Sequence, residues 1–440
     1  MVTPEPGPES EPEPGPEPGP GHEWAGIGPV APRPGEDLAP LISWLRTGKA
    51  AEARIDFPAG TALPDGRLDL CKQAIGPDGA ARVAAALPGV DTVLPGLSLP
   101  VAARPAQIAV RHLLLGTDGL GDGGAGSVAE SAGEKGINTL YLGCNGITAG
   151  GVCRMADKLR SSEVGMSAQA VRALGAQTGV KAVWLKRNPL GPAGGEAAAA
   201  LVASAPGLRT LDLVQTGLTA AALGALTEAL IAAHGTGREF ERLYVGGNRL
   251  GEAGAQALAT LIAAGAVGEL YVSAAELGDG GAHILAAALA AAPPNRLQRL
   301  SVASNGIGPA ACARLVAAAA RTGVSVLDLG RIRAAHALAA ADNRVDATAA
   351  DSIGTSLASA PHRLTHLVLT DTGMRSAEAI SLLRHLETPH ASAPIRVVLG
   401  KGIATTVRKR FAVLAQNVPQ PAVPADVAAV RSVHRTAPRP

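Results

Sequence analysis

A short pattern, L-x-L-x-x-N-x-L-G-x-x-G, recurs along the 440-residue chain and limits its possible folds more than any other feature. It is visible in TLYLGCNGITAGG from Thr139, RLYVGGNRLGEAG from Arg242 and RLSVASNGIGPAA from Arg299. Its Asn column falls at positions 73, 118, 145, 188, 216, 248, 275, 305, 343 and 372, and several steps are near 28 residues. A unit this short cannot bury an apolar face by itself, so the pattern predicts a stack of units that share one core.

Each unit has the pattern of one strand followed by one helix. The L-x-L segment alternates apolar and variable residues, which is typical of a half-buried strand. In the segment 253–265, Leu258, Leu261 and Ile262 lie at the spacing of one helix face. The chain has only three Phe, three Tyr and three Trp although 47% of it is hydrophobic. A narrow core between thin layers, filled by Leu, Ile, Val and Ala, explains this composition.

The repeats resemble leucine-rich repeats of the ribonuclease-inhibitor type over residues 67–400. This resemblance implies an α/β solenoid, a horseshoe with a parallel sheet on its concave face and helices on its convex face. It also implies that the Asn side chains bind backbone groups at each turn; the matching positions are Asn145, Asn188, Asn248, Asn305 and Asn343. The column departs from Asn at Gln73, Asp118, Thr216, Ala275 and Thr372. The family's cysteine-rich column is absent, so ribonuclease binding is not expected here.

The composition changes at both ends of the repeats. Residues 1–40 are rich in Pro, Glu and Gly and predict a disordered acidic tail. Residues 41–66 are expected to cap the first repeat. Residues 401–440 are expected to complete a C-terminal cap and to end in a basic, disordered tail, whose single acidic residue is Asp426.

Composition and motifs exclude several function classes. The formal net charge of +2 argues against a nucleic-acid-binding protein. The N-terminus lacks the pattern of a signal peptide and no apolar run approaches ~18 residues, so no membrane association is expected. The four cysteines show no CxxC spacing and predict reduced thiols in a cytoplasmic protein. Metal-binding, P-loop and nucleophile motifs are missing, so we expect no metal, no cofactor and no enzymatic activity.

Strand alternation predicts which side chains face the hollow of the horseshoe. The predicted concave column is Leu114, Tyr141, Trp184, Asp212, Tyr244, Tyr271, Ser301, Asp328 and Val368. Every Tyr of the chain lies in this column. We interpret Tyr141, Trp184, Tyr244 and Tyr271 as an exposed aromatic stripe that binds a partner. The alternative is that the rings only pack against one another along the sheet.

Charged residues flank this stripe. The predicted rim consists of Lys186, Arg242, Glu269 and Arg299. Asp212 and Asp328 of the column are also expected to bind the partner, together with Arg331 and Arg333 from an insertion at 330–342. Mixed charge signs favour a protein or peptide partner over a phosphate backbone.

The sequence therefore predicts a scaffold that binds a protein partner on its concave face. Two alternatives stay open. The repeats are also similar to those of the GTPase-activating protein of the Ran-type GTPase, which would imply a regulator of a small GTPase. A passive scaffold that uses its convex helices or its tails is the other. The sequence determines neither the partner nor the oligomeric state.

Overall fold

One sheet of thirteen strands runs through the residues that the computed structural model describes, which are 30–88, 110–165, 179–388 and 393–434. The strands lie side by side in chain order. They are β1 (Ile55–Phe57), β2 (Gly60–Ala62), β3 (Arg67–Asp69), β4 (His112–Leu114), β5 (Thr139–Tyr141), β6 (Ala182–Trp184), β7 (Thr210–Asp212), β8 (Arg242–Tyr244), β9 (Glu269–Tyr271), β10 (Arg299–Ser301), β11 (Val326–Asp328), β12 (His366–Leu369) and β13 (Arg396–Leu399). All pairs from β3 to β13 are parallel, and β1 and β2 add an antiparallel hairpin at the first edge.

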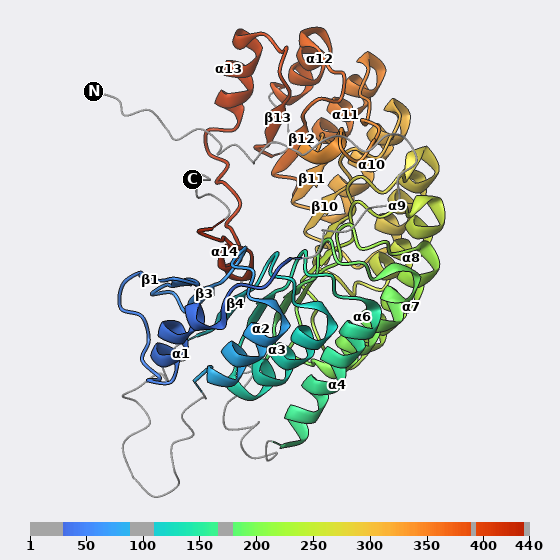
Figure 1. The fold of residues 1–440 in the computed structure, drawn as a ribbon. Coiled ribbons are helices and arrows are strands. Elements are labelled where there is room, and N and C mark those ends of the chain that lie inside the picture. Colours follow the sequence, from blue (N-terminus) through green and yellow to red (C-terminus); the bar gives the residue numbers. More distant parts are fainter. Residues whose placement is uncertain (1–29, 89–109, 166–178, 389–392, 435–440) are drawn as a thin grey trace, which may run out of the picture.

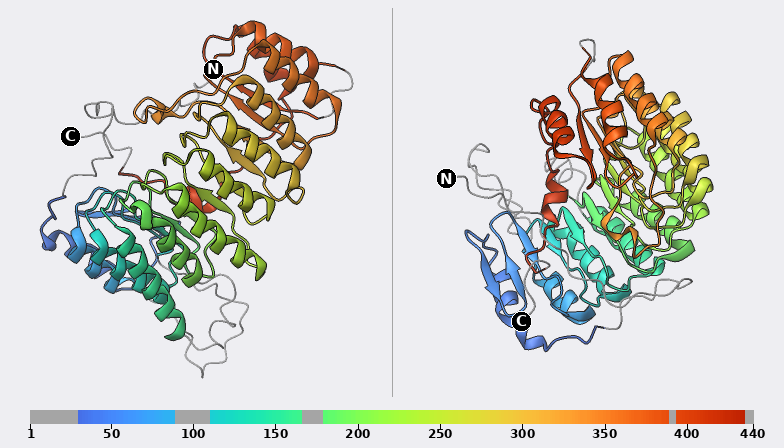
Figure 2. Two further views of the ribbon diagram at one scale, coloured as in Figure 1. Left: turned by 90° about the vertical axis from the view of Figure 1, so that its right-hand side faces the viewer. Right: turned by 90° about the horizontal axis from the view of Figure 1, so that it is seen from above.

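A single layer of helices covers the outer side of the curved sheet, as Figures 1 and 2 show. Each helix connects two neighbouring parallel strands. They are α2 (Gly76–Ala86), α3 (Gly121–Lys135), α4 (Ala149–Gly165), α6 (Gly194–Ser204), α7 (Ala220–Gly235), α8 (Gly251–Ala263), α9 (Gly278–Ala291), α10 (Pro309–Thr322), α11 (Ala347–Ser359) and α12 (Ser376–Leu386). The predicted α/β leucine-rich-repeat horseshoe is thus confirmed.

The main core lies between the sheet and the helices. The central strand residues, such as Leu140, Leu243 and Leu300, are completely buried and form register partners along the sheet. Leu258, Leu261 and Ile262 of α8 are buried in the same core, as their helical spacing predicts. At about 25 cal/mol per Å² of apolar surface, this aliphatic layer is the dominant stabilising contribution.

The N-terminal end of the sheet is covered by residues of the predicted cap. Helix α1 (Ala39–Leu45) buries Leu41, Ile42 and Leu45, and the ring of Trp44 lies 5.6 Å from that of Phe57 in β1. The prediction of a disordered tail over 1–40 is wrong for its last part, because residues 30–38 pack on the first units; residues 1–29 lie outside the described residues. The Arg33 N–H, for example, donates to the carbonyl oxygen of Ala74 at 2.8 Å.

The C-terminal segment differs most from its prediction. Helix α13 (Thr405–Leu414) covers β13, with Val407 and Phe411 buried. The chain then runs across the hollow of the horseshoe to the short helix α14 (Ala425–Ala429), which lies against strands β5 to β8 (Figure 1). We call residues 415–434 the C-terminal arm. The sequence predicts a solvated tail here, but the structure places this arm on the concave face.

Candidate functional site

The predicted concave column forms one continuous register row. Tyr141 pairs with Leu114 on one side and Trp184 on the other. The row continues through Asp212, Tyr244, Tyr271, Ser301, Asp328 and Val368. Strand alternation is therefore a sufficient guide to which residues share this face.

The aromatic stripe is much less exposed than the sequence predicts. Tyr141 is only 4% and Trp184 only 7% exposed, and Tyr244 and Tyr271 are half-buried. Tyr141 and Trp184 form a second, smaller apolar cluster with Cys71, Leu114 and Ala182, separate from the main core. Val427 and Val430 of the C-terminal arm pack against this cluster, which explains why the expectation of four open rings is wrong.

The rings contact each other along the sheet. The ring centroids of Trp184 and Tyr244 are 5.2 Å apart at 38°, and those of Tyr244 and Tyr271 are 4.1 Å apart and nearly parallel. Burial raises the pKa of both tyrosine hydroxyls, so both stay neutral. Packing and binding are both compatible with this row.

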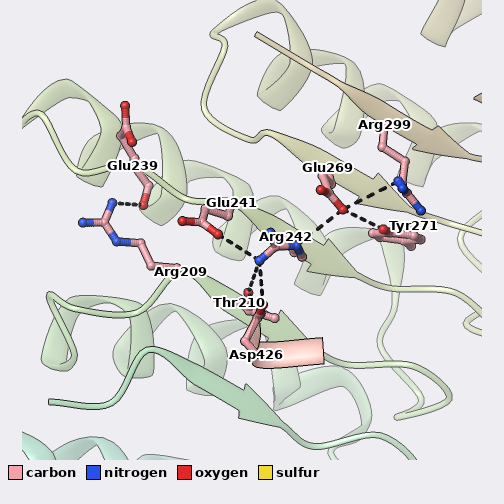
Figure 3. Close-up of polar contacts among 9 residues, drawn as sticks. All are labelled: Arg209, Thr210, Glu239, Glu241, Arg242, Glu269, Tyr271, Arg299 and Asp426. Carbon is pink, nitrogen blue, oxygen red and sulfur yellow. Dashed lines mark hydrogen bonds and ion pairs between the residues drawn. The ribbon is translucent and has the colours of Figure 1, made fainter. Parts of the chain in front are cut away.

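A charged row lies two residues earlier on the same strands (Figure 3). Arg242, Glu269 and Arg299 are register partners on β8, β9 and β10. The Glu269 carboxylate lies 3.4 Å from Nε of Arg242 and 3.8 Å from Nε of Arg299, and it accepts a 2.6 Å hydrogen bond from the Tyr271 hydroxyl. The guanidinium of Arg299 lies 6.0 Å from the Tyr271 ring centroid. The charged and aromatic rows therefore form one connected surface.

The C-terminal arm joins this surface through Asp426. One Asp426 oxygen lies 2.9 Å from Nη1 of Arg242, and the other accepts a 2.6 Å hydrogen bond from the Thr210 hydroxyl (Figure 3). Glu241 also pairs with Nη1 of Arg242, at 2.8 Å. Arg242 is thus held by three carboxylates, of which one comes from the arm.

A second set of bonds fixes the end of the arm on β3. Asp69, which is completely buried, accepts hydrogen bonds from the Val433 N–H at 2.6 Å and from the Ser432 hydroxyl at 3.2 Å. The Arg67 guanidinium donates to the carbonyl oxygen of Arg431 at 2.5 Å. The arm therefore has polar contacts with strands at both ends of its short helix.

Between these contacts and α13 the arm bridges an open space. A cavity of about 340 Å³ lies between residues 419–422 of the arm and the edge of strands β9 to β12. Its walls include Glu269, Arg299 and His366. Burial lowers the pKa of His366, which favours the neutral imidazole in this wall.

The remaining predicted binding residues lie at different depths. Nζ of Lys186 lies 5.9 Å from the Tyr141 ring centroid. Asp212 is buried between the strands of Trp184 and Tyr244, and accepts from the Val214 N–H at 2.8 Å. Asp328 accepts from the Gly330 N–H and the Ser301 hydroxyl, and burial raises the pKa of its carboxyl. The carboxylates of Asp212 and Asp328 therefore accept hydrogen bonds from residues of the sheet and its turns.

The insertion at 330–342 projects beyond the exit of β11. Arg331 and Arg333 are exposed there, and Nη1 of Arg331 pairs with Asp342 at 3.0 Å. Residues 333–335 form one 3₁₀ turn. The two arginines lie outside the polar network around Asp426.

The predicted Asn ladder is present at all five positions. Asn188 shows its pattern: Oδ1 accepts from the Asn145 and Ile147 N–H groups, and Nδ2 donates to the carbonyl oxygens of Leu142 and Leu185, all within 3.1 Å. Asn145, Asn248, Asn305 and Asn343 make equivalent bonds to two neighbouring turns. These bonds satisfy backbone groups that the turns would otherwise leave unpaired.

One departure from Asn has a chemical consequence. Asp118 accepts from the Gln73 N–H through Oδ1 at 2.8 Å, but its buried Oδ2 has no partner among the described residues. Burial raises the pKa of this carboxyl well above the usual aspartate value. A protonated Oδ2 can donate where Asn donates through Nδ2.

Sequence reasoning missed the contacts that hold the C-terminal arm on the concave face. Thr210, Asp426, Asp69 and Arg67 are separated from their contacts by up to 364 residues, and no repeat pattern links them. The one available signal was that Asp426 is the only acid in the basic segment 401–440.

Two further observations concern the described residues alone. No three His, Cys, Asp or Glu side chains gather there as a metal site, and no disulfide joins the four cysteines. None of the helices described has both the length and the apolar character that crossing a bilayer requires.

No family model matches the chain, and no curated protein matches it. Among the solved structures it is similar to the crystal structure of a TLR13–ssRNA13 complex, with 13% sequence identity and a TM-score of 0.28. The match covers 67% of this chain and 33% of that one, so this chain spans about a third of its length.

Proposed function

We propose that the chain is a protein-interaction scaffold that holds a polypeptide segment on the concave face of its repeats. A leucine-rich-repeat solenoid is suited to protein binding in general, because its sheet presents a long, rigid surface. The observation that carries the proposal is the C-terminal arm: Asp426, Val427 and Val430 already bind to this face.

The surface beside the arm supplies further binding groups. Tyr244, Tyr271 and Arg299 are half-buried and line the face next to the arm, and Arg331 and Arg333 are exposed at its edge. Amphipathic rings beside paired charges are typical of protein interfaces. Tyr141, Trp184 and Asp212 lie deeper and belong to the floor of this surface, and Lys186 is half-buried beside Tyr141.

We assign the repeats to the ribonuclease-inhibitor-like subtype, and the protein to a reducing, cytoplasmic compartment. The helix in each unit and the Asn ladder support the subtype. Cys312, buried in the core with a pKa raised to about 12 by burial, supports a thiol that stays reduced. No contact on the concave face specifically favours the GTPase regulator or the passive convex scaffold over this proposal.

Site-specific crosslinking tests the proposed face. A photoreactive phenylalanine analogue replaces Val368, a half-buried residue of the concave row, or Gln256, an exposed residue of α8 on the convex layer. We expect defined protein adducts from position 368 and none from 256, and loss of those adducts when Arg299→Ala is added. Equal adducts from both positions, or adducts that ignore Arg299→Ala, would refute a concave binding face.

A further inference from the structure

We infer that the partner segment carries the chemistry of the C-terminal arm: an aspartate followed by aliphatic side chains at the first and fourth positions after it. In this view the arm is a displaceable occupant of the face and competes with the partner. The inference rests on the proposed function and specifies its partner.

The carboxylate position on the face is well defined. Thr210 is completely buried, and its hydroxyl donates to Asp426 at 2.6 Å. Arg242 approaches the other Asp426 oxygen at 2.9 Å while Glu241 and Glu269 hold its side chain. A hydroxyl and a guanidinium that point to one place suit a single carboxylate. An aliphatic or basic side chain at that position would lose both bonds.

The aliphatic positions follow directly along the arm. Val427 and Val430 are separated by three residues, so one turn of helix places both against the cluster of Tyr141 and Trp184. This combination requires a carboxylate at one position and branched aliphatic groups one and four residues later. It is a peptide specificity that can be written as D-V-x-x-V.

The arm can leave without disturbing the repeats. Residues 419–423 are exposed, Val423 to 57%, and the linker contains Pro419, Pro421 and Pro424, which favour an extended chain. At its start the arm follows α13 directly. Arg396 of β13 holds it there by donating to the carbonyl oxygens of Ala415 and Val418. Only the contacts of residues 426–434 must break for the face to open.

The arm is also an incomplete occupant. Nε1 of Trp184 is buried and has no hydrogen-bond partner among the described residues. A partner that supplies an acceptor to this N–H gains a bond that the arm does not make, and so can compete with the high local concentration of a tethered arm.

Binding of a synthetic peptide to the full-length chain tests the inference. The probe is a fluorescent peptide of residues 419–434, measured by anisotropy against the wild-type chain and against an arm-release variant, Asp426→Arg with Val430→Asp. We expect the release variant to bind at least tenfold more tightly, because its own arm no longer competes. Adding Arg242→Ala to it should reduce binding at least tenfold. Val423→Asp, a change in the exposed linker, is the matched control and should behave as the wild-type chain.

Three results would overturn the inference. The first is equal peptide binding, or no binding, in the wild-type chain and the release variant. The second is loss of the whole cooperative unfolding transition in the release variant, which would make the arm part of the fold. The third is a wild-type dimer whose formation needs Asp426, because a second copy would then be the occupant. Each of these three results can occur while the crosslinks from position 368 persist. The inference can therefore fail without failure of the proposed function, and the two outcomes can be distinguished.

Discussion

Replacing Asp118 by Asn is expected to stabilise the fold, although most changes at buried positions destabilise. The variant keeps the acceptor for the Gln73 N–H and adds an amide where the buried Oδ2 has no partner. At Asn145 the same Nδ2 donates to the carbonyl oxygens of Leu115 and Leu142. An unpaired buried polar atom costs about 1–3 kcal/mol, which is the gain expected at pH 8.

The pH dependence of this gain gives the sharper test. The raised pKa of Asp118 means that the folded chain binds a proton more tightly than the unfolded chain. Wild-type stability therefore falls as pH rises above about 4, by up to about 1.4 kcal/mol per pH unit, until the folded-state pKa is passed. Near pH 4 the protonated carboxyl donates as the amide does, so the variant should gain little there.

Urea unfolding at pH 4, 6 and 8, followed by circular dichroism, measures the difference. The control is Asp157→Asn, whose side chain is 70% exposed and which should change stability by less than about 0.5 kcal/mol at every pH. A variant that is less stable than the wild-type chain at pH 8, or a gain that does not vary with pH, would refute this assignment of Asp118.

Two further substitutions test the packing and the ladder. Gly195→Ala should cost about 3 kcal/mol or more, because the new Cβ would lie 1.7 Å from the carbonyl oxygen of Ala222 on α7. Gly224→Ala has open space around its Cβ and should stabilise α7 by about 0.5–1 kcal/mol. Thermal unfolding separates the two variants, and equal effects would contradict the close contact of α6 with α7. Asn248→Ala should cost about 3–5 kcal/mol through the loss of the buried hydrogen bonds of its side chain, whereas Arg249→Ala, 81% exposed, should cost under about 1 kcal/mol. Similar urea midpoints for the two variants would show that the ladder contributes little.

The repeats were predictable because their information is local and repeated. Two apolar residues two positions apart determine which face of each strand is buried. The spacing of about one repeat unit determines which strand lies beside it. This is enough to place Tyr141 beside Trp184 and Tyr244 beside Tyr271. The Asn ladder likewise consists of hydrogen bonds between adjacent turns, so the column of Asn residues in the sequence predicts it.

The covering of the concave face was not predictable in the same way. Asp426 contacts Thr210 and Arg242 across 216 and 184 residues. The arm that carries it is rich in proline and belongs to the basic segment 401–440, whose composition is typical of a tail. A pattern analysis assigns such a segment to solvent because it lacks apolar periodicity. Only two valines and one aspartate bind it to the cluster and the charged row, too few residues to form a pattern.

Amide hydrogen exchange of the arm tests the central claim most directly. The account predicts that the Val433 N–H, which donates to buried Asp69 at 2.6 Å, is protected in the wild-type chain, and that Asp426→Arg with Val430→Asp removes this protection while strands β5 to β9 keep theirs. Complete exchange of residues 426–434 in the wild-type chain at the earliest time point, or loss of protection in the arm and the strands together, would contradict a polypeptide held separably on the concave face.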